Sequence, residues 1–262
     1  MHNTMSNSDR TELKKAKHLL EHITFANKII NTFGKPIEWT ISRLPEKFHN
    51  KVAIISHKSI AKAMDYACWT LPNQGGCWKR LHMTGAMTTG AIGGYFGIAG
   101  LSVELPISTV LMLRSIAAIA RTNGESLYLP ETRLACTQVL ALGGKSSEDD
   151  AMDASYLTFR AALADQMRIA AAWLATDASR RKAQPILIRL IQTIASRFSI
   201  VVKEKVIAQA IPFIGGVGGA AVNATFMDHF QDKAEGHFIF RRLERKYGSE
   251  VVEEEYRNLE SE

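Results

Sequence analysis

Two long stretches without a charged side chain constrain the fold of this chain more than any other feature. Residues 81–103 and 206–227 form runs of 23 and 22 residues that contain no Asp, Glu, Lys or Arg. A helix of about 20 residues is long enough to cross a bilayer. Each stretch is therefore long enough to enter lipid, and each is equally suited to a buried helix in a soluble domain.

Both stretches are rich in glycine and together hold ten of the chain's 18 glycines. A spacing of i, i+3, i+4 and i+7 places residues on one stripe of a helix. The first stretch has this spacing at Gly90, Gly93, Gly94 and Gly97, and the second has its first three positions at Gly215, Gly218 and Gly219. Because a helical Gly costs roughly 1 kcal/mol relative to Ala, such clustering usually serves close approach between helices. We expect the two glycine-rich helices to pack together, and their polar side chains favour partial insertion into lipid over a permanent transmembrane hairpin.

The rest of the sequence has the periodicity of helices. With 46% hydrophobic and 22% charged residues, the chain is neither disordered nor collagen-like. Apolar spacing and the Pro, Gly and Ser signals at the ends predict helices over residues 11–31, 36–44, 46–69, 106–122, 130–142, 185–209, 212–247 and 249–259, with another through Tyr156, Phe159 and Leu163. Alternating strand patterns are scarce. The sequence therefore predicts an all-α fold.

We expect three parts along the chain: a basic amphipathic helical segment over residues 1–44, a single all-α domain over 45–250 and an acidic tail over 251–262. The three cysteines have no metal-ligand spacing, which is typical of a reducing compartment. The polar first ten residues lead into no apolar run, so we expect no signal peptide and an intracellular location.

Basic residues are in excess, with 32 Lys and Arg against 26 Asp and Glu. Arg189, Arg197, Lys203 and Lys205 lie off the apolar stripe of the helix predicted over residues 185–209. A basic amphipathic helix binds an anionic membrane surface, although a core helix with solvated basic residues has the same pattern. Aromatic residues do not alternate with the basic ones, so we expect no nucleic-acid partner.

Three polar side chains stand inside apolar sequence. Glu104 and Arg114 are charged, and a charge in such a place is costly unless it is paired. A structural ion pair or an exposed helix-end carboxylate beside Pro106 is the favoured interpretation, and a polar pocket is the alternative. Asn223 we interpret as a buried amide that joins two helices.

The densest group of acidic and histidine side chains lies in residues 228–237. Asp228, Asp232 and Glu235 share a helix face, which is typical of a solvated face and also suits a hard cation. His229 and His237 lie beside that face. The sequence contains no HExxH or GxSxG motif, and the G-x-G-x-x-A match at residues 216–221 lacks a βαβ context. We therefore expect no cofactor and no metal, with a metal-dependent hydrolase using residues 228–237 as the alternative.

Several segments resemble the EcsC protein family: residues 93–106 with their Gly93-Gly94, Gly97 and Gly100, residues 109–120 with Arg114, residues 211–215 with Asn223, and residues 234–248. The resemblance implies a bacterial cytoplasmic protein, in some cases encoded beside an ABC exporter, with no established catalytic activity and no catalytic residues. It singles out Gly93, Gly94, Gly97, Gly100, Glu104, Pro106, Arg114, Gly215 and Asn223.

These observations together predict a non-enzymatic cytoplasmic protein that associates peripherally with the inner membrane. It would bind lipid or an integral membrane partner through its glycine-rich helices and its basic surfaces, and the family resemblance implies an ABC exporter as such a partner. A soluble helical interaction scaffold is a further alternative. The residues expected to bind or to pack are Gly90, Gly93, Gly94, Gly97, Gly100, Glu104, Pro106, Arg114, Gly215, Gly218, Gly219 and Asn223.

Overall fold

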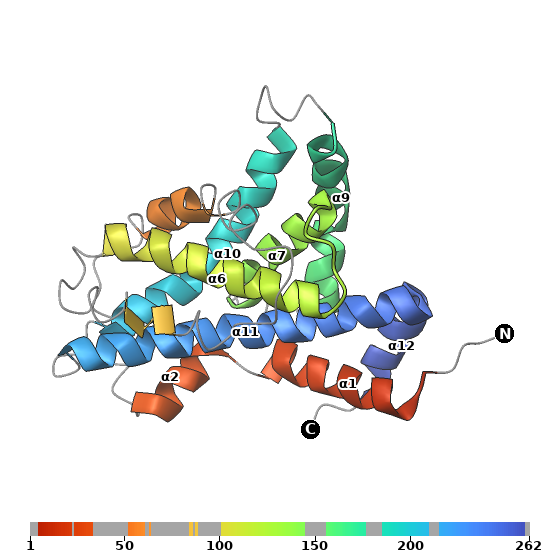
Figure 1. Ribbon diagram of the computed structural model, residues 1–262, viewed down its shortest axis with the longest axis horizontal. Coiled ribbons are helices and arrows are strands. Elements are labelled where there is room, and N and C mark those ends of the chain that lie inside the picture. The colour runs from red at the N-terminus through yellow and green to blue at the C-terminus, as the bar shows by residue number, and fades with distance from the viewer. Residues whose placement is uncertain are drawn as a thin grey trace.

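Helix α11, Gly215–Tyr247, is the axis around which the other helices are arranged. Its 33 residues run across the whole width of the molecule in Figure 1. The computed structural model describes residues 5–22, 24–33, 52–60, 63, 84–85, 87–88, 101–144, 156–176, 185–209 and 215–259. Within these ranges the regular structure is helical and no strand occurs, which confirms the predicted all-α class.

Most helix boundaries lie close to the predicted ones. Other helices among the described residues are α1 (Asn7–Lys17), α2 (Phe25–Phe33), α6 (Leu101–Thr122), α7 (Pro130–Leu142), α9 (Tyr156–Leu174), α10 (Pro185–Gln209) and α12 (Ser249–Asn258), with a π-helical turn, η1 (His18–His22), after α1. Residues 52–60 are helical as well and lie inside the helix predicted over residues 46–69. The bounds of α7 and α10 are those the sequence predicts. Prolines at their first positions explain the agreement, since Pro is well suited to the first turn of a helix.

The helix predicted over residues 11–31 is wrong as a single element. Helix α1 ends at Lys17, η1 follows, and α2 begins at Phe25. The Thr24 hydroxyl accepts a hydrogen bond from the Asn27 backbone N–H at 3.2 Å, which is the geometry of a helix N-cap. A new helix therefore starts here although the apolar periodicity continues.

Helix α6 also differs from its prediction. It is helical from Leu101, so Pro106 lies inside the helix and not at its start. The missing N–H of Pro106 removes one backbone hydrogen bond. The hydroxyls of Ser108 and Thr109 both donate to the Leu105 carbonyl, at 3.1 and 2.7 Å.

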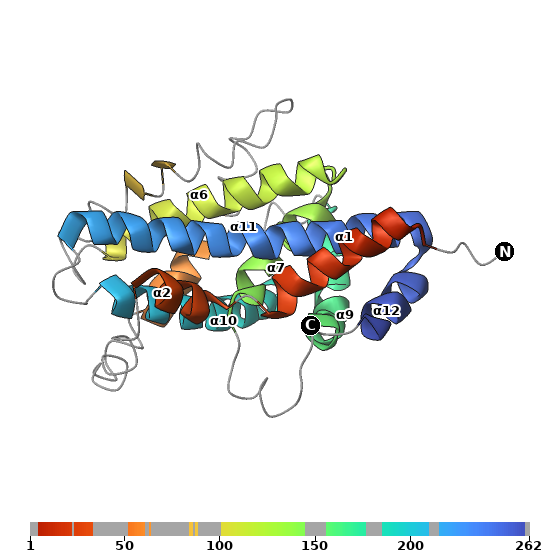
Figure 2. The same ribbon diagram turned by 90° about the horizontal axis from the view of Figure 1, so that it is seen from below.

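Among the described residues, two hydrophobic clusters hold the helices together. The larger one joins α6, α7, α10 and α11, with Phe198, Phe226 and Phe230 in mutual ring contact. The smaller one joins α1, α11 and α12 through Leu13, Phe240 and Tyr256. Figure 2 shows α6 on one side of α11, and α2, α10 and α12 on the other. The first and last described helices thus pack on the same long helix.

Close approach between helices requires glycine at Gly236 of α11. A Cβ added there would lie 2.8 Å from Leu20 and 2.9 Å from the Ala16 carbonyl oxygen. Gly144, after the end of α7, is equally tight, because an added Cβ would lie 2.3 Å from the Arg197 carbonyl oxygen of α10. These glycines let α1 and α10 pack backbone against backbone on their neighbours.

In the part of the chain that the structure describes, two helices are long and apolar enough to cross a membrane by length and composition alone. The first is Val103–Thr122 in α6, and 67% of its apolar 18-residue stretch is buried inside the protein. The second is α10, where the buried share of the corresponding stretch is 39%. Neither coincides with an uncharged glycine-rich stretch. The second of those stretches is split, since residues 206–209 end α10 and α11 begins at Gly215.

Candidate functional site

The glycine stripe can be followed only in the second glycine-rich stretch. Gly215, Gly218 and Gly219 lie in the first turns of α11, where Gly218 and Gly219 are buried. The first stripe lies outside the described residues: Gly90, Gly93, Gly94, Gly97 and Gly100. Packing of the two glycine-rich helices therefore stays a prediction. The G-x-G-x-x-A match lies wholly within helix α11, whereas a dinucleotide fingerprint needs a turn between a strand and a helix.

The buried polar centre of the protein is formed by Glu104 of α6, Lys205 of α10 and Asn223 of α11. Lys205 Nζ lies 2.5 Å from Glu104 Oε1, and the Asn223 amide donates to the same oxygen at 2.8 Å. The side chains of Lys205 and Glu104 are 0% and 4% exposed. The ammonium also lies 4.7 Å from the centre of the Phe226 ring. This triad joins three helices by charge-assisted hydrogen bonds.

The triad corrects the prediction that Lys205 belongs to a basic surface. Burial lowers the pKa of its ammonium, whereas the charge and hydrogen bond of Glu104 favour the charged form. Asn223 is a buried amide between two helices, as the sequence predicts. Of the two interpretations favoured over a polar pocket, the structure has the ion pair at Glu104 and not the exposed helix-end carboxylate. Arg114 is half-buried in α6.

The other basic residues of α10 differ in their surroundings. Arg189 is exposed, and Lys203 is half-buried. Arg197 donates to the Gly144 carbonyl at 3.3 Å and stacks over the Phe159 ring at 4.1 Å. Arg197 therefore packs against α9 in addition to carrying charge, and Arg189 is the clearest solvent-facing cation of this set.

The three acidic side chains of residues 228–237 face lysines of the N-terminal helices. Lys28 of α2 pairs with Asp228 and with Asp232, the latter at 2.6 Å, and Lys15 of α1 pairs with Glu235 at 2.5 Å. The face is thus an ion-paired contact between helices and not simply a solvated one. Among the residues that the structure describes, no group of three or more His, Cys, Asp or Glu could hold a metal ion.

Both histidines of this segment are fully buried. His229 Nε2 lies 3.2 Å from the Gly143 carbonyl oxygen, and His237 Nδ1 lies 2.8 Å from the Tyr156 hydroxyl. Burial, reinforced by nearby cations, lowers the pKa of each imidazole well below its usual value. The two histidines are therefore neutral at pH 7 and serve as core hydrogen-bonding groups.

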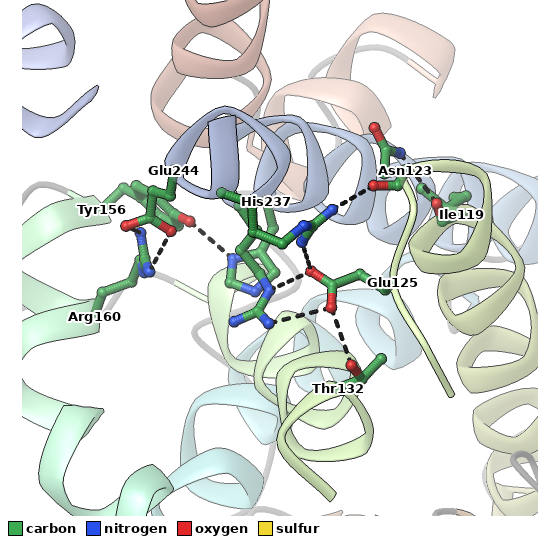
Figure 3. A network of polar contacts seen from close by, with 10 residues as sticks. Ile119, Asn123, Glu125, Thr132, Tyr156, Arg160, His237 and Glu244 are labelled. Atoms are coloured by element: carbon green, nitrogen blue, oxygen red, sulfur yellow. Dashed lines mark hydrogen bonds and ion pairs between the residues drawn. The ribbon is translucent and has the colours of Figure 1, made fainter. Parts of the chain in front are cut away.

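A second polar network lies around Glu125, in the connection between α6 and α7 (Figure 3). Arg241 donates to its two carboxylate oxygens at 2.7 and 3.3 Å, Arg245 pairs with the same group, and the Thr132 hydroxyl donates at 3.0 Å. Burial opposes ionisation of Glu125, but the hydrogen bonds and charges of the arginines outweigh it and lower the pKa. Arg245 also donates to the Asn123 carbonyl at 2.6 Å.

Helix α9 contacts the same end of α11 through a second ion pair. Arg160 forms two hydrogen bonds to Glu244, at 3.1 and 2.9 Å, and lies over the Phe240 ring at 4.7 Å. A cavity of about 570 Å³ opens beside this pair between α9 and α12, and its lining includes Leu157, Ala161, Ala164, Ser249, Glu253 and Arg257. Arg257 and Glu253 in the lining pair with each other at 3.0 Å, and Arg160, which also lines the cavity, pairs with Glu244.

Sequence reasoning missed the Glu125 network and the Arg160–Glu244 pair. One signal was present, because Arg241 stands in the segment whose likeness to a known family was noted. The loop residue Glu125 carried none, since an acidic residue after Asn123-Gly124 is ordinary turn sequence.

The family model described as the EcsC protein family matches residues 7–243 of the 262-residue chain. The chain belongs to the EcsC family. No curated protein and no solved structure matches it. The recognition made from the glycine-rich and arginine-containing segments is thus confirmed, and the match also takes in α1, which the sequence assigned to a separate N-terminal segment.

In this EcsC chain the described polar groups hold helices together. Glu104, Lys205 and Asn223 join α6, α10 and α11, and the Glu125 network attaches the α6–α7 connection to α11. Each group is engaged by protein partners at hydrogen-bond distance. The arrangement supports a rigid helical scaffold.

Proposed function

We propose that this EcsC protein is a non-enzymatic, membrane-associated protein of the cytoplasm that contacts lipid or an integral membrane partner with apolar helices and basic side chains. The observation that carries the proposal is the character of α10. This helix is apolar enough to cross a membrane, yet only 39% of its apolar 18-residue stretch is buried inside the protein.

The exposed residues near the start of α10 include an apolar and a basic side chain. Ile188 is 42% exposed, and Arg189 beside it is exposed as well. A helix with this composition lies in the membrane interface, with its apolar side chains below the headgroups and its arginines among them. Peripheral association needs no permanent span, and it agrees with α6 being mostly buried.

The engagement of the acidic residues supports this proposal over the hydrolase alternative. A catalytic carboxylate must be available to substrate, to a metal or to water. Asp228, Asp232 and Glu235 are instead paired with lysines of α1 and α2. The buried histidines His229 and His237 lie within hydrogen-bond distance of a carbonyl and a hydroxyl.

Vesicle flotation tests the proposal. The purified chain is mixed with vesicles of phosphatidylcholine containing phosphatidylglycerol, and we expect it to float with them. Arg189→Glu should weaken this binding, since each basic residue near an anionic surface contributes about 1 kcal/mol, and the effect should shrink in high salt. Arg168→Glu is the matched control, because Arg168 is 75% exposed on α9. A chain that never floats, at any salt or lipid charge, would refute the proposal.

A further inference from the structure

The connection between α6 and α7 presents two adjacent apolar side chains to solvent. Tyr128 is 70% exposed and Leu129 is 52% exposed, while Leu127 before them packs against the larger core cluster. We refer to Tyr128 and Leu129 as the apolar tip. A single exposed apolar residue is ordinary. Exposure alone therefore does not make the apolar tip a binding surface, and three further observations support that role.

The first such observation is that Leu129 occupies the N-cap position of α7 and makes no side-chain capping hydrogen bond. Ser, Thr, Asp or Asn at an N-cap stabilises a helix, because its side chain accepts a hydrogen bond from a free backbone N–H. Leucine gives up that contribution and also exposes its own apolar surface. Local choices that lower stability are typical of functional positions.

The second observation is that the tip is held rigidly. The Leu129 N–H donates to the Ser126 carbonyl at 3.1 Å, which closes a turn around Leu127 and Tyr128. Arg133 Nε donates to the Leu127 carbonyl at 2.9 Å. Directly before the turn, Glu125 is fixed by Arg241, Arg245 and Thr132 (Figure 3). Burying this carboxylate would be costly without its partners, so the connection is built to keep one conformation.

The third observation is the chemistry beside the tip. Arg133, Arg241 and Arg245 contact the connection, against Glu125 and the exposed Glu131, so guanidinium groups are in excess by one. Tyrosine, with an apolar ring and a polar hydroxyl, is characteristic of the membrane–water interface. Guanidinium groups form strong hydrogen bonds with phosphate. An exposed Tyr-Leu pair beside arginines therefore matches the apolar-to-phosphate gradient of a phospholipid surface.

We propose that Tyr128 and Leu129 are a membrane-contact element that enters the interfacial region of a phospholipid bilayer, with the exposed Arg133 meeting lipid phosphates. The proposal rests on the proposed function and adds to it a second contact point, separate from α10. Its apolar contribution depends on the tip and not on lipid charge, which distinguishes it from the contribution of Arg189.

The N-cap position makes a sharp experiment possible. Leu129→Asn replaces an apolar residue by a preferred N-cap residue, so we expect the melting temperature to rise by roughly 2–4 °C. The same variant should bind vesicles less well. In Tyr128→Ser/Leu129→Ser we expect the partition coefficient onto phosphatidylcholine–phosphatidylglycerol vesicles to fall at least about tenfold. Ile169→Ser is the matched control, because Ile169 is 44% exposed on α9, outside the tip.

The outcomes separate the two proposals. If the native chain and Ile169→Ser bind vesicles while both tip variants lose binding, with Leu129→Asn at least as stable as the native chain, the membrane-contact element is supported. If the native chain binds and the tip variants bind equally well, this inference is refuted while the proposed function stands, and the tip would then serve a protein partner. If the native chain binds no vesicle, the proposed function fails and this inference fails with it.

Discussion

Removing either charge of the buried triad should destabilise the protein strongly, and the two removals should respond to pH in opposite directions. Lys205 and Glu104 are almost fully buried, and their charged atoms lie 2.5 Å apart. Deleting one partner of a buried pair costs about 3–5 kcal/mol, because the remaining charge has no counter-ion. The remaining group can become neutral by gaining or losing a proton. The free-energy cost of that proton transfer is therefore an upper limit on the loss of stability.

The limit can be worked out for each variant. In Lys205→Met, Glu104 must take up a proton, and protonating a carboxyl of reference pKa about 4.3 at pH 7 costs about 3.7 kcal/mol. In Glu104→Gln, Lys205 must lose its proton, and deprotonating an amine of reference pKa about 10.4 at pH 7 costs about 4.6 kcal/mol. For a domain of this size, losses of 3–5 kcal/mol lower the melting temperature by roughly 6–20 °C.

The pH dependence follows from the same proton transfers. In Lys205→Met the buried Glu104 carboxyl has lost its counter-ion and must take up a proton on folding, so the loss of stability should fade as the pH falls towards the reference carboxyl value of about 4.3. In Glu104→Gln the folded-state pKa of Lys205 is lowered further, so the loss should fade as the pH rises towards about 10.4. Both are compared with the native chain at each pH.

Denaturant unfolding of both variants between pH 5 and 9 measures these effects. The double variant Glu104→Leu/Lys205→Met is the matched control, since replacing a whole buried pair by apolar residues is often neutral or stabilising. A loss below about 1 kcal/mol in both single variants, or a loss that does not change with pH, would refute the reasoning.

Two further predictions concern α11. Gly236→Ala should lower stability by up to about 2 kcal/mol, because overpacking against Leu20 and Ala16 exceeds the gain in helix propensity, whereas Gly85→Ala, which meets Leu111 at 3.4 Å, should change the denaturation midpoint little. The lowered pKa values of His229 and His237 mean that the unfolded chain binds more protons than the folded one below pH 6.5. The free energy of unfolding should therefore fall by about 1.4 kcal/mol per pH unit for each histidine as the pH drops. A His229→Gln/His237→Gln variant with the same pH dependence would contradict this.

The sequence predicts the helices well because their ends carry local signals. Pro130 and Pro185 start α7 and α10 at the predicted residues, and Gly124, with φ of 81°, ends the helix that precedes the Glu125 connection. The break between α1 and α2 was missed because Thr24 caps a helix by a single hydrogen bond, within an apolar pattern that continues on both sides.

The polar contacts were harder to predict because they join residues far apart in the sequence. The isolated charge at Glu104 indicated an ion pair, but Lys205 is 101 residues away and stands among other basic residues of α10. Periodicity assigns a residue to a face and not to a partner. Lys205 was for this reason placed on a surface, although its side chain points into the core. The acidic face of α11 was likewise read without the lysines of α1 and α2 that cover it.

The packing of the first helix on the last has a consequence for how the chain is made. Lys17 donates to the carbonyl oxygen of Leu259, 242 residues later, at 2.6 Å. At a synthesis rate of about 5–20 residues per second, the two ends of this contact emerge from a ribosome roughly 12–48 s apart. During that interval the apolar face of α1 around Leu13 has been synthesised but lacks its packing partners from α11 and α12. The nascent protein therefore exposes this apolar face until its C-terminal helices have been translated.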